Sequence, residues 1–367
     1  MTIGEAFRTG GLEIHSSGVT QDGAEHQFSV VYEDLEIAEV IGRGCSSVVL
    51  RARHVGTDRP LALKVINMFE KGKRHQLINE INALYDASHP TEFHTGVNNY
   101  VLCSSLFGWC ITPFCEWSVI QFLGAFYREG AVTIITEYMD GGSLLNVLRQ
   151  VGAVPERALS SVAYQVLLAL DYLKREKRIV HRDIKPSNLL INSQGVVKVN
   201  RQGVVNVNSQ RVVDVDSFRV VKVTDFGTSA GLQSSFAMCG TFVGTFKYMS
   251  PERMKNERYS YSSDVWSLGL VLMECATGEF PYRDETTAID LVQTIVDAPA
   301  PELDPSSFPA NFCSFVADCL RKRPDDRSPA QALLGAPWIT GGGLAVNLNA
   351  DLVSATANVK RWIDSPS

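Results

Sequence analysis

Short β-rich runs of apolar and polar residues dominate the first part of the sequence. They cover residues 36–41, 47–53 and 61–66, and turns that contain Gly or Asp separate them. A further run of this kind follows at residues 133–138. Alternation with a period of two is typical of strands, and short turns favour antiparallel pairing. The pattern predicts an antiparallel sheet.

Helical spacing then takes over. Within residues 71–86, Leu77, Ile81 and Leu84 stand at i, i+4 and i+7, which is one apolar helical face. Long helical patterns follow at residues 159–173 and 265–277. The order predicts an α+β fold in which a small β-rich lobe precedes a larger helical lobe.

The lobes that we expect form one domain over residues 34–339, with an N-lobe at 34–139 and a C-lobe at 140–339. Residues 1–33 are rich in Gly, Ser and Thr and show little periodicity, which predicts a flexible tail. Residues 340–367 form a second tail, in which residues 344–362 could make an amphipathic helix.

The amino-acid composition excludes several classes of function. A chain of 367 residues that is 45% hydrophobic can bury a full-sized core. The net charge of -6 gives no basic surplus for nucleic acid or an anionic membrane, so neither partner is expected. No apolar run reaches the length of a membrane span, and the eight cysteines form no regular framework. Reduced thiols favour the cytoplasm, with the nucleus as an alternative.

A glycine-containing turn lies between the first two predicted strands. Ile41, Gly42 and Gly44 would let the backbone close over phosphates where a Cβ would clash. Ser47 stands where a third glycine would complete the nucleotide-binding pattern. By itself the segment is equally well explained as an ordinary turn.

Two charged residues are predicted to point inward. Lys64 ends an apolar strand whose alternation directs it toward the interior. Glu80 shares the helical face of Leu77 and Leu84. Because a buried charge needs a partner, each residue supplies what the other lacks. The alternative is two unrelated surface charges.

The segment around Asp183 carries the most specific chemistry. Asp183, Lys185 and Asn188 fall in one short loop after a helix, and phosphoryl transfer uses all three residue types. Asp183 would accept the proton of a substrate hydroxyl, Lys185 would offset charge on the γ-phosphate, and Asn188 would hold a metal ion. Asp225, followed by Phe and Gly, supplies a second carboxylate for Mg²⁺.

With both motifs in this order, the sequence resembles eukaryotic protein kinases over residues 34–339. The resemblance implies the two-lobed kinase fold, with ATP and Mg²⁺ bound between the lobes. It also implies that Glu252 pairs with Arg327, and that Asp264 braces the catalytic loop from below. Around the adenine it implies Val49, Ala62 and Leu190 as the apolar walls, Thr136 at the back and the backbone of Glu137 and Met139 as hydrogen-bonding groups. The same residues could also be plain core residues.

Within the kinases, residues 137–144 and 240–253 resemble those of MAP kinase kinases, and Lys185 is typical of the Ser/Thr type of loop. The resemblance implies transfer of the ATP γ-phosphate to Thr and Tyr in the activation loop of a MAP kinase. It further implies a MAP kinase as substrate and a MAP kinase kinase kinase as the upstream activator. The rival hypothesis is a catalytically weak scaffold that binds partners of this pathway.

The charge of Arg182 suggests that phosphorylation regulates the protein. Arg182 precedes the catalytic base and would lack a counter-ion unless the activation segment brings a negative group, which phosphate would supply. Ser235 and Thr241 are separated by five residues, which resembles the spacing of plant-type MAP kinase kinases. Ser234 and Thr245 are the alternatives.

Two segments depart from the family pattern. Four near-copies of an eight-residue unit run from residue 192 to residue 223, so that about residues 200–223 are surplus. Residues 91–117 hold three cysteines and two tryptophans where the family has a short turn. Both could be removed without disturbing the flanking motifs, which leaves retained intron sequence as an alternative origin.

A docking peptide for a MAP kinase is the last feature to consider. Members of the family often carry basic residues followed by alternating aliphatic residues near the N-terminus. Arg8, with Leu12 and Ile14, offers a weak match to that pattern.

Overall fold

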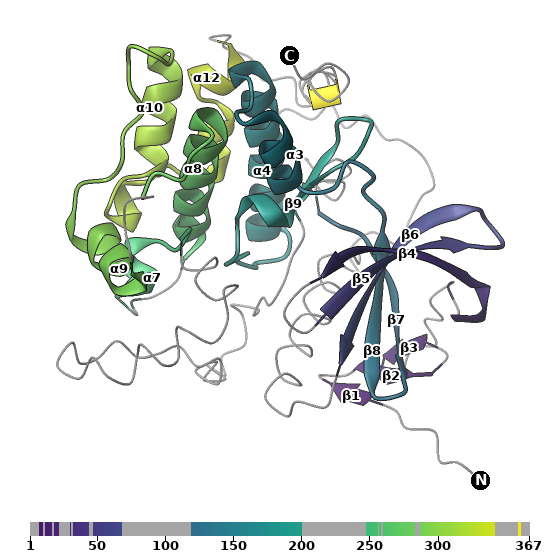
Figure 1. Cartoon of the computed structure of the whole chain (residues 1–367). Coiled ribbons are helices and arrows are strands. Elements are labelled where there is room, and N and C mark those ends of the chain that lie inside the picture. Colours follow the sequence, from purple (N-terminus) through teal and green to yellow (C-terminus); the bar gives the residue numbers. More distant parts are fainter. Residues whose placement is uncertain are drawn as a thin grey trace, which may run out of the picture.

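The protein folds into a β-rich lobe and a helical lobe (Figure 1), which confirms the predicted fold class. The structure is a computed structural model. It describes residues 7–9, 12–16, 18–21, 30, 32–43, 47–67, 119–199, 247–255, 257, 260–282, 287–341 and 359–360.

The N-lobe is built on a five-stranded antiparallel sheet with the order β4-β5-β6-β8-β7. Its strands are β4 (Leu35–Arg43), β5 (Ser47–His54), β6 (Arg59–Asn67), β7 (Phe122–Arg128) and β8 (Ala131–Glu137). The three runs predicted first and the run at 133–138 correspond to β4, β5, β6 and β8. Along β6, Leu61 and Leu63 are buried while Ala62 and Lys64 between them are half-buried on the other face. One face of the sheet therefore forms a small apolar core with Ala52, Phe126 and Ile135.

Three further strands precede this sheet. Strands β1 (Phe7–Thr9), β2 (Leu12–His15) and β3 (Gly18–Gln21) pair antiparallel, and β2 and β3 contact β7. The Ile14 side chain is fully buried. The expected flexible tail is therefore wrong over these strands, and Ile14 cannot serve as an exposed docking residue while β2 is in place.

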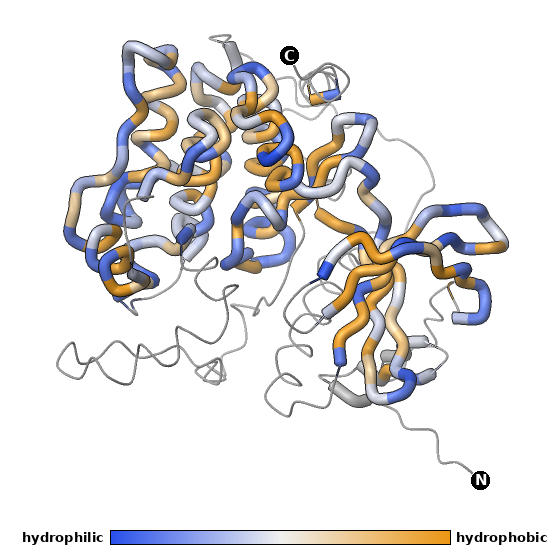
Figure 2. The backbone as a smooth tube through the Cα atoms, in the orientation of Figure 1, coloured by the Kyte–Doolittle hydropathy of each residue, from blue (hydrophilic) through white to orange (hydrophobic). Residues whose placement is uncertain are grey.

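The C-lobe is organised around α4 (Glu156–Arg175), in which every residue from 161 to 173 is buried. It packs against α8 (Tyr261–Thr277), α11 (Ala330–Leu334) and α12 (Pro337–Thr340). Figure 2 shows the apolar positions gathered along the inner sides of these helices. The remaining described α-helices are α3 (Leu144–Val151), α7 (Pro251–Met254), α9 (Ala288–Asp297) and α10 (Ala310–Cys319). No helix in the described ranges combines the length and hydrophobicity needed to cross a membrane.

A short hairpin of the C-lobe is bonded to the segment that follows the N-lobe. Strands β9 (Leu189–Ile191) and β10 (Val197–Val199) pair antiparallel beneath the segment that links β8 to α3. The Gly141 N–H donates to the Ile191 carbonyl at 3.0 Å, and the Ile191 N–H donates to the Gly142 carbonyl at 2.8 Å. A Cβ on Gly141 would lie 2.8 Å from the Ile191 oxygen, so this close approach requires glycine.

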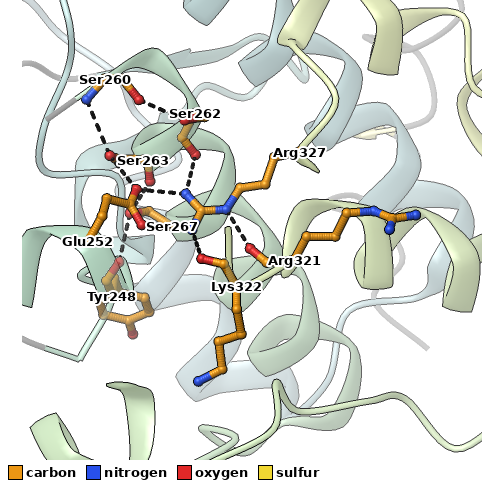
Figure 3. A network of polar contacts seen from close by, with 9 residues as sticks. All are labelled: Tyr248, Glu252, Ser260, Ser262, Ser263, Ser267, Arg321, Lys322 and Arg327. Atoms are coloured by element: carbon orange, nitrogen blue, oxygen red, sulfur yellow. Dashed lines mark hydrogen bonds and ion pairs between the residues drawn. The ribbon is translucent and has the colours of Figure 1, made fainter. Parts of the chain in front are cut away.

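A buried ion pair ties the lower part of the C-lobe together (Figure 3). Two Arg327 guanidinium nitrogens donate to the two oxygens of the Glu252 carboxylate, each at 2.7 Å. Both side chains are almost completely buried. Arg327 also donates to the carbonyls of Ser262, Arg321 and Lys322, and the Ser263 hydroxyl donates to Glu252. The pair thus connects α7, α8 and the segment that leads to α11.

Burial and pairing act in opposite directions on Glu252. Burial raises the pKa of its carboxyl, but the hydrogen bond and charge of Arg327, together with the Ser263 hydroxyl, hold that pKa below its ordinary value. Glu252 is therefore ionised in the folded protein because its partners outweigh desolvation.

Removing one partner of this pair should be costly. We expect Arg327→Ala to lower the free energy of unfolding by about 3–5 kcal/mol, because it leaves a carboxylate buried without its cation. The exposed pair of Arg323 and Asp326 provides the control, and Arg323→Ala should cost less than about 1 kcal/mol. Urea unfolding of both variants measures the difference, and equal losses would contradict it.

The penalty of Arg327→Ala should also depend on pH. In the parent protein the depressed pKa of Glu252 contributes stability that is present above the unfolded pKa and is lost as the pH falls through the folded pKa. In the variant the Arg327 cation is gone and burial disfavours the charged form of Glu252. Protonation of this carboxyl therefore removes the free-energy cost of burying its charge. We expect the destabilisation to shrink between pH 7 and about pH 4. Urea unfolding at both pH values tests this, and a constant penalty would refute it.

Candidate active site

The loop between α4 and β9 brings three predicted catalytic side chains together. Lys185 Nζ lies 2.8 Å from Asp183 Oδ2, and Asn188 Nδ2 donates to the same oxygen at 2.7 Å. Asn188 also donates to the Asp183 backbone carbonyl at 2.8 Å. Asn188 ends a 3₁₀ turn, Pro186–Asn188, and is buried, whereas Asp183 and Lys185 keep partial exposure. The Asp183 carboxylate is thus partly exposed to solvent, and the Lys185 ammonium and the Asn188 amide both contact one of its oxygens.

This arrangement suits proton transfer and metal binding. Among the described residues, the side-chain contacts of the Asp183 carboxylate are made through Oδ2, so Oδ1 is the atom that can accept a hydroxyl proton. Asn188 uses its amide nitrogen in both hydrogen bonds, and its amide oxygen is left as a hard ligand of the kind that Mg²⁺ prefers. Among the described residues, the amide oxygen of Asn188 therefore fits one ligand position of a magnesium ion.

The catalytic loop is held from below by Asp264 on α8. Its Oδ2 accepts the His181 N–H at 2.7 Å, and its Oδ1 accepts the Arg182 N–H at 2.8 Å. Arg182 has a φ of 72°, a left-handed conformation that is strained for a residue with a side chain. Arg253 Nη1 donates to the Arg182 carbonyl at 2.5 Å. Both backbone groups of this strained residue are therefore anchored.

The N-lobe presents a second group of predicted residues on one sheet face. Gly42 pairs with Val49, Val49 pairs with Lys64, and Ala62 pairs with Thr136 across neighbouring strands. Since paired residues share a face, all five lie on the side opposite the apolar core of the N-lobe. Ile41 precedes Gly42 at an irregularity in the pairing, and 42% of its surface is exposed.

The linker between the lobes carries the remaining predicted adenine contacts. Glu137 ends β8, Met139 is buried just after it, and Leu190 of β9 forms a β-bridge with Ser143. The Glu137 carboxylate accepts hydrogen bonds from Lys198 Nζ at 2.6 Å and from the Gln121 N–H at 2.8 Å. The sequence alone implied a role only for the backbone of Glu137 and gave none to Lys198. The signal was the single cation in the Val-Val-Lys-Val segment of the first repeat copy.

Several predicted residues lie outside the described part of the chain. They are Gly44, Glu80, Asp225, Ser235 and Thr241, as well as the predicted helix at 71–86 and both surplus segments. The Lys64 to Glu80 pair and the second metal ligand therefore stay predictions. Within the described residues, no group of three or more His, Cys, Asp or Glu side chains could hold a metal.

Comparison with known proteins supports one family. Residues 116–339 match the model of the protein kinase domain. The chain is 41% identical over 321 residues to mitogen-activated protein kinase kinase 3 of Arabidopsis thaliana, which covers 87% of this chain and 52% of that relative. It is 40% identical to mitogen-activated protein kinase kinase SIPKK of Nicotiana tabacum, over 84% of this chain and 74% of the relative. It is also 33% identical to the dual specificity mitogen-activated protein kinase kinase dSOR1 of Drosophila melanogaster, over 84% of this chain and 71% of the relative.

The anchor formed by Asp264 can be tested without any substrate. Asp264→Asn keeps one acceptor but turns an amide group toward a backbone N–H, and we expect a loss of about 1–3 kcal/mol in unfolding free energy. Amide exchange at His181 and Arg182 should rise together with that loss. The control Asp318→Asn removes an ion pair with the exposed Arg321 and should cost less than about 1 kcal/mol. Unchanged exchange at His181 and Arg182 in Asp264→Asn would contradict the proposed anchoring.

Proposed function

This chain belongs to the MAP kinase kinases within the protein kinase family, and we propose that it transfers the γ-phosphate of ATP to Thr and Tyr in the activation loop of a MAP kinase. The observation that carries the proposal is the contact of Lys185 and Asn188 with one oxygen of Asp183. A loop anchored through its backbone by Asp264 supports it, because phosphoryl transfer depends chiefly on positioning.

In the proposed reaction a substrate hydroxyl lies against Asp183. The hydroxyl oxygen forms a bond to the γ-phosphorus, the bond between that phosphorus and the β,γ-bridging oxygen breaks, and ADP leaves. Asp183 takes the hydroxyl proton, and Lys185 offsets the charge on the transferred group. Asn188 and Asp225 would hold Mg²⁺, which neutralises phosphate charge when bound.

The sheet face of the N-lobe would bind the nucleotide. Lys64 is proposed to contact the phosphates, while Val49, Ala62 and Leu190 enclose the adenine. Thr136 would lie behind the base, and the backbone of Glu137 and Met139 would make its hydrogen bonds. Gly42 supports this placement, since it lies opposite Val49 on that face.

Regulation and partners are part of the same proposal. Phosphorylation of Ser235 and Thr241 by a MAP kinase kinase kinase would activate the enzyme, with Arg182 as the cation that receives the phosphate. The names of the relatives, which are mitogen-activated protein kinase kinases, support a place in such a cascade. A cytoplasmic location, with access to the nucleus, is proposed with it.

One observation favours the rival scaffold function. Strand β10 ends at Val199, while Asp225 stands 26 positions further along the chain. The connection is longer than the single short hairpin that the resemblance implies, and the entropic cost of ordering a connection rises with its length. Binding of pathway partners without turnover is therefore the second candidate.

Phosphate transfer from Mg-ATP to a kinase-inactive MAP kinase separates the two functions. The chain with Ser235→Glu and Thr241→Glu should phosphorylate both Thr and Tyr, and adding Asp183→Asn should lower kcat by about 10²-fold to 10⁴-fold because the proton acceptor is lost. Asp304→Asn, which alters an exposed carboxylate in the C-lobe, should leave the rate unchanged.

The outcome decides between the candidates. Transfer no greater than that of the Asp183→Asn variant, with the MAP kinase still bound, would favour the scaffold. Transfer to Ser and Thr alone would refute dual specificity.

A further inference from the structure

The Lys198 side chain forms a largely buried ion pair at the end of β8. Its Nζ donates to Glu137 Oε1 at 2.6 Å, and the side chains of Lys198 and Glu137 are 11% and 16% exposed. The Gln121 N–H donates to the same oxygen at 2.8 Å. The Glu137 N–H in turn donates to the Gln121 carbonyl at 3.2 Å. These hydrogen bonds hold both the side chain and the backbone of Glu137 in place.

The backbone around Lys198 is held on both sides. Its neighbours Val197 and Val199 are buried in the hairpin of β9 and β10. The Val197 N–H donates to Gln165 Oε1 on α4 at 2.8 Å. The Val199 carbonyl accepts the Ile120 N–H at 3.2 Å. Because the backbone is bonded before and after Lys198, the position from which its side chain reaches Glu137 is fixed.

The register of the hairpin links Lys198 to the adenine site that we propose. Lys198 lies directly opposite Leu190, which is the proposed apolar wall on the C-lobe side of the base. Residues that lie opposite each other in an antiparallel pair share one face. One face of the hairpin thus carries both the residue proposed to pack on the base and the cation that binds Glu137, whose backbone is proposed to bond that base.

The backbone of Glu137 indicates which base fits. Its N–H donates to Gln121, so its carbonyl is the backbone group of this residue that a base could meet. A carbonyl oxygen accepts a hydrogen bond from the amino group of adenine, whereas guanine carries an oxygen acceptor at the corresponding position. Two acceptors that face each other form no hydrogen bond and repel. A carbonyl that is held firmly at this position therefore favours adenine over guanine.

We propose that Lys198 is a positioning residue for nucleotide selection, because its ammonium holds Glu137 so that the carbonyl of that residue meets the amino group of adenine. Lys198 acts through Glu137 and does not itself contact the base. Without the ammonium, a largely buried carboxylate lacks its cation, and the Glu137 side chain gains free energy by turning toward water. Its peptide group then loses the orientation that adenine requires. This inference rests on the proposed kinase function, which places the base beside Leu190.

Displacement of a fluorescent ADP analogue from the full-length chain by ATP and by GTP, with Mg²⁺ present, tests the role of Lys198. Lys198→Met should weaken ATP binding by about tenfold, the effect of one impaired hydrogen bond. The preference for ATP over GTP should fall by about the same factor, because guanine does not use this carbonyl. Lys198→Arg keeps the cation and should recover most of the preference. Arg323→Met removes a cation from an exposed pair with Asp326 and should leave both affinities unchanged.

A double variant separates positioning from a structural role. Lys198→Met combined with Glu137→Gln leaves no unpaired charge, so its urea unfolding should return close to that of the parent protein. The preference for ATP should stay low in this variant, because no cation holds the side chain at position 137. In transfer assays Lys198→Met should raise the KM for ATP and leave kcat nearly unchanged, since the contacts of Asp183 are not altered.

Three outcomes would overturn the positioning role. They are an unchanged preference in Lys198→Met, equal losses for ATP and GTP, and a preference equal to that of the parent protein in the double variant. If Lys198→Met does not fold, the double variant and Lys198→Arg still decide the question. A parent protein that binds neither nucleotide would refute the proposed function and the inference with it, whereas ATP binding with unchanged selectivity in Lys198→Met refutes the inference alone.

Discussion

The geometry of the candidate active site depends on one carboxylate that lies outside the catalytic loop. Asp264 accepts two consecutive backbone N–H groups of the catalytic loop, and it is buried on α8, one of the helices that pack on α4. These bonds hold Arg182 in a left-handed conformation that its side chain disfavours. The strain is offset by the helical core, so the direction in which Asp183 points is set by the packing of the C-lobe rather than by the loop itself.

Much of the fold could be read from periodicity, because burial of one face leaves a regular trace in the sequence. Strands β4, β5, β6 and β8 and helices α4 and α8 were predictable for this reason. Strands β1 to β3 were not, because they are short, come from a segment rich in Gly and Thr, and contact β7. Contacts with the rest of the fold stabilise these strands, and such contacts leave no local pattern in the sequence.

The site was predictable where its residues are close in sequence. Asp183, Lys185 and Asn188 share one loop, so their spacing already implied contact. The role of Asp264 followed only from resemblance, since it bonds to backbone atoms 82 and 83 positions away, and backbone atoms have no sequence signature. The bond between Glu137 and Lys198 spans 61 positions and joins two strands of different sheets, so only the assembled fold reveals it.

The contact between β9 and the segment that follows β8 has a consequence for how variation in this protein is interpreted. Gly141, Gly142 and Ile191 hold it together with main-chain atoms, and a methyl group is excluded at Gly141. Alanine scanning would therefore detect the excluded methyl group at Gly141, whereas at Ile191 it would report the loss of a buried side chain and leave the main-chain bonds in place. Main-chain atoms thus fix the start of the C-lobe to β9, and substitutions that change only side chains leave those bonds intact.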